Sequence, residues 1–231
     1  MGFTFDGTPV TRSFGKMGKS LKNSVTPDDM YAAFGADTLR LYEMSMAPIT
    51  QDRPWETRSV VGSQRLLQRV WRNIVDEQTG ELAVSDDAPS EELLRVLHKT
   101  IDGVTADMDN LRYNTAIAKL TELNNEVTKA EGPTPRVVAD AMVRMLSPLV
   151  PHMAEELWSK LGGAGSVVWA HFPAADASYL VDDQVELPVQ VKGKVRGRVR
   201  VAPDADESIA LAAATADENV ASHIAGAEIR K

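Results

Sequence analysis

The chain has 231 residues, of which 43% are hydrophobic and 25% are charged, proportions that are ordinary for a soluble globular protein. This length allows one large or two small domains, each with its own core. No apolar run approaches the roughly 20 residues that a membrane-spanning helix needs, and the N-terminus has no hydrophobic signal core. We therefore expect a cytoplasmic protein without membrane contact. The net charge of −8 argues against indiscriminate nucleic-acid binding.

Cysteine is absent, and the histidines are His98, His152, His171 and His223, which are far apart in sequence. This composition excludes disulfides and thiolate zinc sites and predicts no metal site. None of the histidines is assigned a catalytic task, and we interpret His152, at a helix start, as a local structural contact.

The first residues predict a β-hairpin over 3–10, because Asp6-Gly7 suits a type I′ turn. A loop follows over Gly15-Lys16-Met17-Gly18-Lys19-Ser20, whose two lysines, hydroxyl and glycines suit a polyphosphate. The phosphate-binding loop of nucleotide triphosphatases does not fit, because Ser13 stands where that motif needs a glycine and no helix follows Ser20. From these residues alone, an exposed basic turn is an equally good interpretation.

Two short helices are predicted next. Thr26 caps the first, Pro27 opens it and Gly35 ends it. The second runs from about Ala36 to Met46. We place a domain boundary in the proline-bracketed segment from 48 to 54, so that residues 1–47 form one region.

Four long helical patterns with short connections predict an antiparallel, up-and-down bundle over residues 48–173. They cover about Glu56 to Asp76, Ser90 to Leu111, Asn114 to Gly132 and Thr134 to Leu161, the last interrupted at Ser147-Pro148 and Pro151. The first helix carries Arg58, Arg65, Arg69 and Arg72 opposite its apolar stripe. The apolar stripe of the second helix extends to Leu111. Trp158 and Trp169 are interpreted as large core side chains.

The last part begins with a small, polar linker over 174–185 and continues as a small α+β domain over 186–231. From Val189 to Val201, valine and glycine occupy odd positions, whereas the even positions include Lys192, Lys194, Arg196, Arg198 and Arg200. This period of two predicts a strand pair with a turn at Lys192-Gly193 and a bulge or odd-length loop. Its cations form either a solvated face or a contact with an RNA backbone. Two short helices follow, and residues 227–231 read as the opening of another strand, which suggests an incomplete domain.

Lys16-Met17-Gly18-Lys19-Ser20 resembles the KMSKS signature of class I aminoacyl-tRNA synthetases, with Gly18 in place of the usual serine. Together with the run from Gly35 to Met44, its order and spacing are similar to those of the bacterial leucyl-tRNA synthetase family. The block from Pro148 to Trp158 resembles the last helix of the anticodon-binding bundle in class I enzymes. The basic strand pair resembles the small C-terminal tRNA-binding domain of the leucine family.

The resemblance implies a mainly α fold, with an anticodon-binding-type helical bundle followed by a truncated α+β domain, which together form the C-terminal part of a leucine–tRNA ligase. Enzymes of this family activate leucine with ATP and Mg²⁺ and transfer it to tRNA(Leu). Lys16 and Lys19 would be catalytic and would stabilise the departing pyrophosphate, and residues 16–20 would bind ATP. The tRNA-binding candidates are Arg58, Arg65, Arg69, Arg72, Lys192, Lys194, Arg196, Arg198 and Arg200.

The other half of the family's ATP site is a histidine-x-glycine-histidine signature, which none of the histidines here matches. We therefore expect a monomer that does not form leucyl-adenylate by itself. Two alternatives stay open. One is another class I synthetase, for isoleucine, valine or methionine, against which the basic strand pair counts. The other is an acidic helical-bundle interaction protein without enzymatic activity or an RNA partner.

Overall fold

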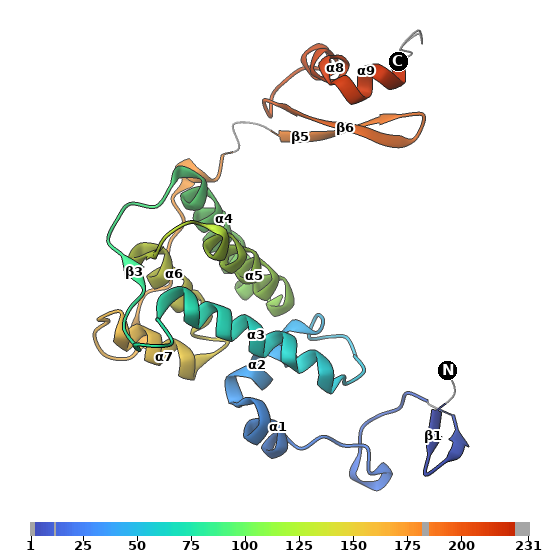
Figure 1. Cartoon of the computed structure of the whole chain (residues 1–231), viewed down its shortest axis with the longest axis vertical. Helices are drawn as coiled ribbons and strands as arrows, with labels where there is room; N and C mark the ends of the chain where they lie inside the picture. Colours follow the sequence, from blue (N-terminus) through green and yellow to red (C-terminus); the bar gives the residue numbers. More distant parts are fainter. Residues whose placement is uncertain (1–2, 12, 182–184, 225–231) are drawn as a thin grey trace. The chain divides into compact units, whose positions relative to one another are not determined.

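The computed structural model describes residues 3–11, 13–181 and 185–224. It divides the chain into two compact units, residues 1–175 and residues 176–231. The larger unit is dominated by α-helices, and the smaller one combines a strand pair with two helices (Figure 1). The predicted mainly α fold with a small α+β part is therefore confirmed. The finer division of the first 175 residues at 48–54 stays a prediction.

The chain begins with a β-hairpin of β1 (Phe3–Phe5) and β2 (Thr8–Val10), which pair antiparallel. Both turn residues have positive φ, 48° at Asp6 and 77° at Gly7, as a type I′ turn requires. The lysine loop ends in a 3₁₀ turn, η1 (Lys19–Leu21), and not in an α-helix. The hairpin and the lack of an α-helix after Ser20 are therefore as predicted.

Two helices then connect the loop to the bundle, α1 (Pro27–Phe34) and α2 (Ala36–Ser45). The Thr26 hydroxyl caps α1 by accepting from the backbone N–H of Asp29 at 3.4 Å. Gly35, at φ 83°, is the only residue between the helices. The α2 helix packs against α3 and α5 and buries Leu39, Leu41 and Tyr42.

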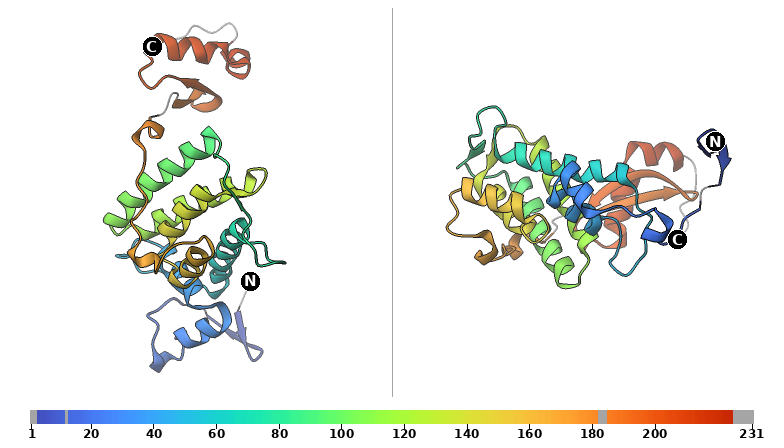
Figure 2. Two further views of the ribbon diagram at one scale, coloured as in Figure 1. Left: turned by 90° about the vertical axis from the view of Figure 1, so that its left-hand side faces the viewer. Right: turned by 90° about the horizontal axis from the view of Figure 1, so that it is seen from below.

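The bundle consists of α3 (Thr57–Ile74), α4 (Glu91–Asp109), α5 (Tyr113–Lys129), α6 (Arg136–Leu146) and α7 (Pro151–Lys160). Helices α4 and α5 lie side by side in both views (Figures 1 and 2). A short parallel pair of β3 (Val84–Ser85) and β4 (Thr134–Pro135) links the α3–α4 and α5–α6 connections. Core side chains with less than 2% exposure come from several helices, among them Leu97, Leu123, Met142 and Leu157.

The predicted interruption of the fourth helical pattern is confirmed, since α6 ends at Leu146 and α7 begins at Pro151. Two assignments to the core are wrong. Trp169 is 85% exposed, because the 3₁₀ turn η2 (Val167–Trp169) buries Val167 instead. Leu111 is 51% exposed, because it lies in the α4–α5 turn with φ at 55°. Trp158, by contrast, packs against the core.

The smaller unit begins with the 3₁₀ turn η3 (Ala177–Tyr179). An antiparallel pair of β5 (Val185–Val191) and β6 (Lys194–Val201) follows, and then α8 (Glu207–Ala216) and α9 (Glu218–Ile224). Both helices contact the strand pair, and Val199, Val201 and Val220 are buried between them. The predicted strand at 227–231 and linker residues 182–184 lie outside the described residues. None of the helices in the described ranges combines the length and the hydrophobicity needed to cross a lipid bilayer.

Candidate lysine loop and nucleic-acid interface

The side chain of Asn23 closes the lysine loop. Its Oδ1 accepts from the backbone N–H of Gly18 at 2.9 Å, and its Nδ2 donates to the carbonyl of Lys16 at 3.5 Å. Lys22 adopts φ 50° just before it, which turns the chain back toward the loop. No role for Asn23 is predicted from the sequence. The sequence signal that could have identified it is a side-chain amide, which can accept and donate at the same time, a few residues after a glycine.

Both ammonium groups of the loop are available to a ligand. Lys16, Lys19 and Ser20 are exposed, and neither lysine has an ion-pair partner among the described residues. Gly18 has an extended backbone at φ −167°, and a Cβ there would meet only the Ser20 hydroxyl, at 3.9 Å. A serine would therefore fit this position, so glycine removes a hydroxyl without being required by the loop geometry.

The arginine stripe on α3 divides into exposed and packed members. Arg58, Arg65 and Arg72 are exposed, as a phosphate contact requires. Arg69 is half-buried, and its Nη1 donates to Asn125 Oδ1 on α5 at 3.0 Å. One turn further, Asn73 Nδ2 donates to Asn124 Oδ1 on α5, at 2.9 Å. Arg69 therefore belongs to a polar seam between α3 and α5, which no periodicity could indicate.

The basic strand pair turns at Lys192-Gly193, as predicted, with φ at 52° and 78°. A register shift between Val189 and Gln190 leaves Arg196 as the extra residue of a β-bulge. On the side of the bulge away from the turn, the valines share the face that α8 and α9 cover. Between the bulge and the turn, Val195 pairs with Gln190, and it is 54% exposed. The valines are therefore not all on one face.

The bulge also separates the five cations of the strand pair. Arg198 and Arg200 lie on the face opposite the helices, and Arg198 Nη1 is 2.9 Å from Glu186 Oε1. Lys192 and Lys194 are exposed at the turn. Arg196 is half-buried, with an Nε atom that has no hydrogen-bond partner. The exposed cations therefore form two groups, one at the turn and one on the face opposite the helices. Both groups present mostly positive charge.

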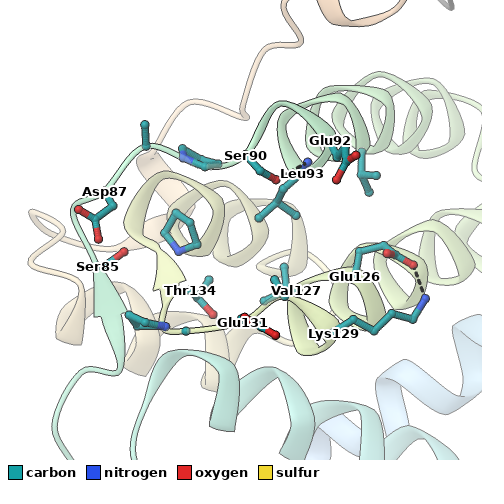
Figure 3. A pocket seen from close by; sticks show the side chains of 17 residues that line it. Ser85, Asp87, Ser90, Glu92, Leu93, Glu126, Val127, Lys129, Glu131 and Thr134 are labelled. Atoms are coloured by element: carbon teal, nitrogen blue, oxygen red, sulfur yellow. Dashed lines mark hydrogen bonds and ion pairs between the residues drawn. The ribbon is translucent and has the colours of Figure 1, made fainter.

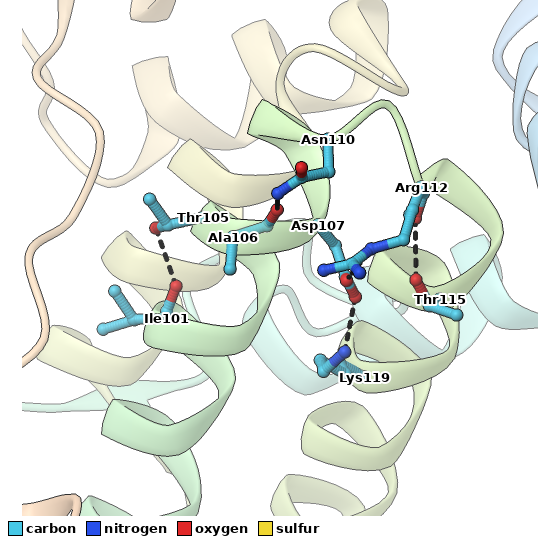
Figure 4. A network of polar contacts seen from close by, with 8 residues as sticks. All are labelled: Ile101, Thr105, Ala106, Asp107, Asn110, Arg112, Thr115 and Lys119. Carbon is cyan, nitrogen blue, oxygen red and sulfur yellow. Dashed lines mark hydrogen bonds and ion pairs between the residues drawn. The ribbon is translucent and has the colours of Figure 1, made fainter.

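The α4–α5 corner contains a buried carboxylate that sequence reasoning missed (Figure 4). Asp107 is 3% exposed, forms an ion pair with Lys119 and lies 2.9 Å from Arg112 Nε. Burial raises the pKa of Asp107, but the hydrogen bonds from Lys119 and Thr115 and the two positive charges outweigh it, so that its pKa lies below the usual value. Gly103 leaves room for the Lys119 stem, since a Cβ there would come within 2.6 Å of Lys119 Cε.

A cleft of about 480 Å³ lies between the start of α4 and the end of α5 (Figure 3). Its walls carry four carboxylates, Asp87, Glu92, Glu126 and Glu131. The single cation there, Lys129, is 2.6 Å from Glu126. This surface repels phosphate, so a nucleic acid would have to approach the basic elements instead. In the described part of the chain, no group of three or more acidic or histidine side chains is placed to hold a metal ion.

Most of the helical bundle and the strand pair match a known family of proteins. Residues 90–211 match the family model of the anticodon-binding domain of tRNA ligase, so the chain belongs to this family. Its curated relatives include the leucine–tRNA ligases of Streptomyces avermitilis (57% identical over 229 residues, 99% of this chain and 24% of the relative) and Saccharopolyspora erythraea (58% over 231 residues, 99% and 24%). The ligase of Mycobacterium avium is 56% identical over 226 residues, 96% of this chain and 23% of that protein.

A solved structure is similar over most of the chain. The ternary complex of an Agrobacterium radiobacter LeuRS with tRNA and LeuAMS superposes with a TM-score of 0.70 at 26% sequence identity, and it covers 94% of this chain and 30% of that one. The chain spans about a quarter of the length of the curated relatives it matches. The family is thus established by residues 90–211, which contain α4 to α7 and the β5–β6 strand pair.

Proposed function

We propose that the chain is the C-terminal part of a leucine–tRNA ligase, which activates leucine with ATP and transfers it to tRNA(Leu). In that enzyme it supplies the lysine loop and the tRNA-binding surfaces. The observation that carries the proposal is the continuous similarity to curated leucine–tRNA ligases, which covers the lysine loop, the bundle and the basic strand pair together. A match to the bundle alone would leave isoleucine, valine and methionine ligases equally good.

The geometry of the lysine loop suits the first step of that reaction. Attack of the leucine carboxylate on the α-phosphate of ATP expels pyrophosphate, and negative charge develops on the leaving group. Two exposed ammonium groups, on Lys16 and Lys19, would neutralise that charge, and the Ser20 hydroxyl would add a hydrogen bond. Asn23 holds the backbone between them. Lys16 and Lys19 are thus the proposed catalytic residues, and residues 16–20 are the proposed ATP contacts.

Mg²⁺ would have to be bound outside this loop. From Ser13 to Asn23 the sequence contains no carboxylate, and Mg²⁺ prefers carboxylate, phosphate and water oxygens. The residues present therefore fit the phosphates of ATP but not the metal ion that accompanies them.

The tRNA would be held through its backbone by the exposed cations of two elements. Arg58, Arg65 and Arg72 on α3 are exposed, and Lys192, Lys194, Arg198 and Arg200 are exposed on the strand pair. On an acidic protein of net charge −8, such local positive surfaces confine phosphate binding to defined places. Arg69 and Arg196 are half-buried, so we assign them to the interface only as its packed margin.

The test is binding of the purified chain to tRNA(Leu) and to tRNA(Ile), each at two salt concentrations. Six to ten phosphate contacts would weaken affinity by about 10³–10⁵-fold between roughly 50 and 200 mM salt. We expect tighter binding to tRNA(Leu), with that steep salt dependence. Equal binding to both tRNAs would contradict the assignment to leucine. Lack of binding to either at low salt would favour a helical interaction protein instead.

A further inference from the structure

The strongest observation outside the proposed ligand sites is a contact between α2 and the break between α6 and α7. Pro148 and Pro151 both lie in that break, and neither has a backbone N–H to donate. Pro151 also disfavours a helical conformation in the residue before it, and Val150 there has φ −132° and ψ 68°. The helix α7 therefore starts with free N–H groups, and its N-cap residue, Val150, provides no side-chain acceptor.

One turn of α2 provides partners on both sides of the break. The buried carboxylate of Asp37 accepts from the backbone N–H groups of His152, at 3.4 Å, and Met153, at 2.7 Å. It acts as an N-cap contributed from 115 residues away, with a negative charge where the helix dipole favours one. The His152 ring also approaches it, with Nδ1 3.3 Å from Asp37 Oδ1, so the contact of His152 is not local.

Arg40 serves the other side of the break. Its Nε donates to the carbonyl of Leu149 at 3.1 Å, and its Nη2 donates to that of Pro148 at 2.9 Å. Because Asp37 and Arg40 are three residues apart on one helix, they lie on the same face of α2. The Asp37 carboxylate thus accepts from free N–H groups at the start of α7, and the Arg40 guanidinium donates to free carbonyls just before it.

The same helix is tied to the lysine loop and to the rest of the bundle. A single residue, Gly35, separates it from α1, which follows the loop. On its other side, the Tyr42 hydroxyl donates to the carbonyl of Glu56 and accepts from its N–H, both at 3.1 Å. The α2 helix therefore connects the lysine loop, through α1, to the α6–α7 segment.

We propose that Asp37 and Arg40 are positioning residues, which fix α1 and α2, the helices that follow the lysine loop, on the bundle so that the loop and the arginine surface of α3 keep one relative placement. The part that concerns catalysis rests on the proposed ligase function. Neither residue belongs to the proposed contacts with ATP or tRNA. Their loss should therefore reduce the rate of the reaction without removing a ligand contact.

The connection between α2 and the α6–α7 segment can be tested in this chain without an activity assay. Because the sequence contains no cysteine, spin labels attach only at introduced cysteines. Ala32→Cys on α1 and Ser159→Cys on α7, both exposed positions, report the distance across the joint. Asp102→Cys and Glu122→Cys report a control distance between α4 and α5. We expect Asp37→Ala and Arg40→Ala to broaden the first distance distribution and to leave the second unchanged.

An unchanged Ala32–Ser159 distribution in both variants would overturn the proposal. If an alanine variant alters the control distance, the conservative changes Asp37→Asn and Arg40→Lys carry the same test. Each keeps the size of its side chain but can satisfy fewer of the backbone groups at the break. Asp52→Asn and Arg53→Lys, the same substitutions at exposed positions between α2 and α3, should leave both distances unchanged.

The catalytic part needs a full-length leucine–tRNA ligase that contains this segment. A displacement of about 1 Å can cost about 100-fold in rate, so we expect Asp37→Ala to lower the kcat of pyrophosphate exchange at least about tenfold. The tRNA dissociation constant should change less than about twofold, since no phosphate contact is lost. An unchanged kcat would overturn the positioning role whatever the distances show. An inactive unsubstituted enzyme would instead contradict the proposed function, while the distances would still test the joint.

Discussion

The two basic surfaces differ in what supports their cations. The α3 stripe stands on a helix whose other side is buried in the main core, and its only half-buried arginine, Arg69, is tied to α5. The strand-pair cations stand on a small unit, where a bulge divides them and the described buried apolar residues are Val199, Val201 and Val220. On α3 the positions of the cations thus follow from the helix itself, with Arg69 as the exception. On β5–β6, the bulge and the packing against the helices decide which face each cation occupies.

The largest expected effect concerns the buried charge of the larger unit. Asp107→Asn removes the charged hydrogen bonds to Lys119 and Arg112, whose own side chains are partly exposed, and we expect a loss of roughly 1.5–3 kcal/mol in the free energy of unfolding near neutral pH. Because the folded-state pKa of Asp107 is depressed, its contribution is present above the unfolded value and is lost as pH falls through the folded one.

Urea unfolding of both proteins at several pH values checks this prediction. The two unfolding free energies should converge in the acid range, below the ordinary carboxylate pKa, and differ fully near pH 7. Glu122→Gln, at an exposed position on α5, is the control and should show little difference at any pH. A pH-independent gap for Asp107→Asn would contradict the depressed pKa.

A pair of glycine substitutions tests the packing under each basic surface. A Cβ at Gly197 on β6 would come within 2.6 Å of Val220 Cγ2 and 2.9 Å of Asp217 Oδ1, so we expect Gly197→Ala to destabilise the small unit by about 1–3 kcal/mol. Gly62 on α3 is exposed with nothing within 4 Å of a Cβ, so Gly62→Ala should stabilise by about 0.5–1 kcal/mol.

Thermal unfolding, with the hydrogen exchange of each unit followed separately, measures both effects. Opposite signs would confirm that the strand pair depends on close backbone approach and α3 does not. A neutral Gly197→Ala would show that α9 can move away from β6 at little cost, which would remove the contrast between the two surfaces.

The smallest effects are expected for single cations. Arg65→Gln on α3 and Arg200→Gln on β6 should each lower the salt slope of tRNA binding by about one and leave stability unchanged. Arg69→Gln should leave the salt slope unchanged and cost roughly 0.5–1.5 kcal/mol of stability, because it removes the hydrogen bond to Asn125. Affinity measured over a salt series, beside a denaturation curve, separates the two classes. A salt slope lower by about one in Arg69→Gln would place this residue among the phosphate contacts.

Local signals were sufficient to predict most elements. Thr26, Ser90 and Gly35 mark helix ends through hydrogen bonds and dihedral angles that involve only neighbouring residues. The turns at Asp6-Gly7 and Lys192-Gly193 depend on positive φ, which the residue types themselves favour. A phosphate-binding role for the lysine loop could be proposed from the sequence for the same reason, since its lysines, glycine and serine lie within five consecutive residues.

Contacts across the fold were not predictable in this way. Trp169 has the hydrophobicity of a core residue, yet Val167 occupies the buried position of that turn. Nothing near Asp37 or Arg40 in the sequence indicates the α6–α7 break, because their partners lie more than 100 residues away. Sequence by itself determined most of the elements and which side chains the lysine loop contains, since these depend on neighbouring residues. Only the tertiary structure decided which charges are free to bind and which hold the helices together, since that depends on what each side chain meets after packing.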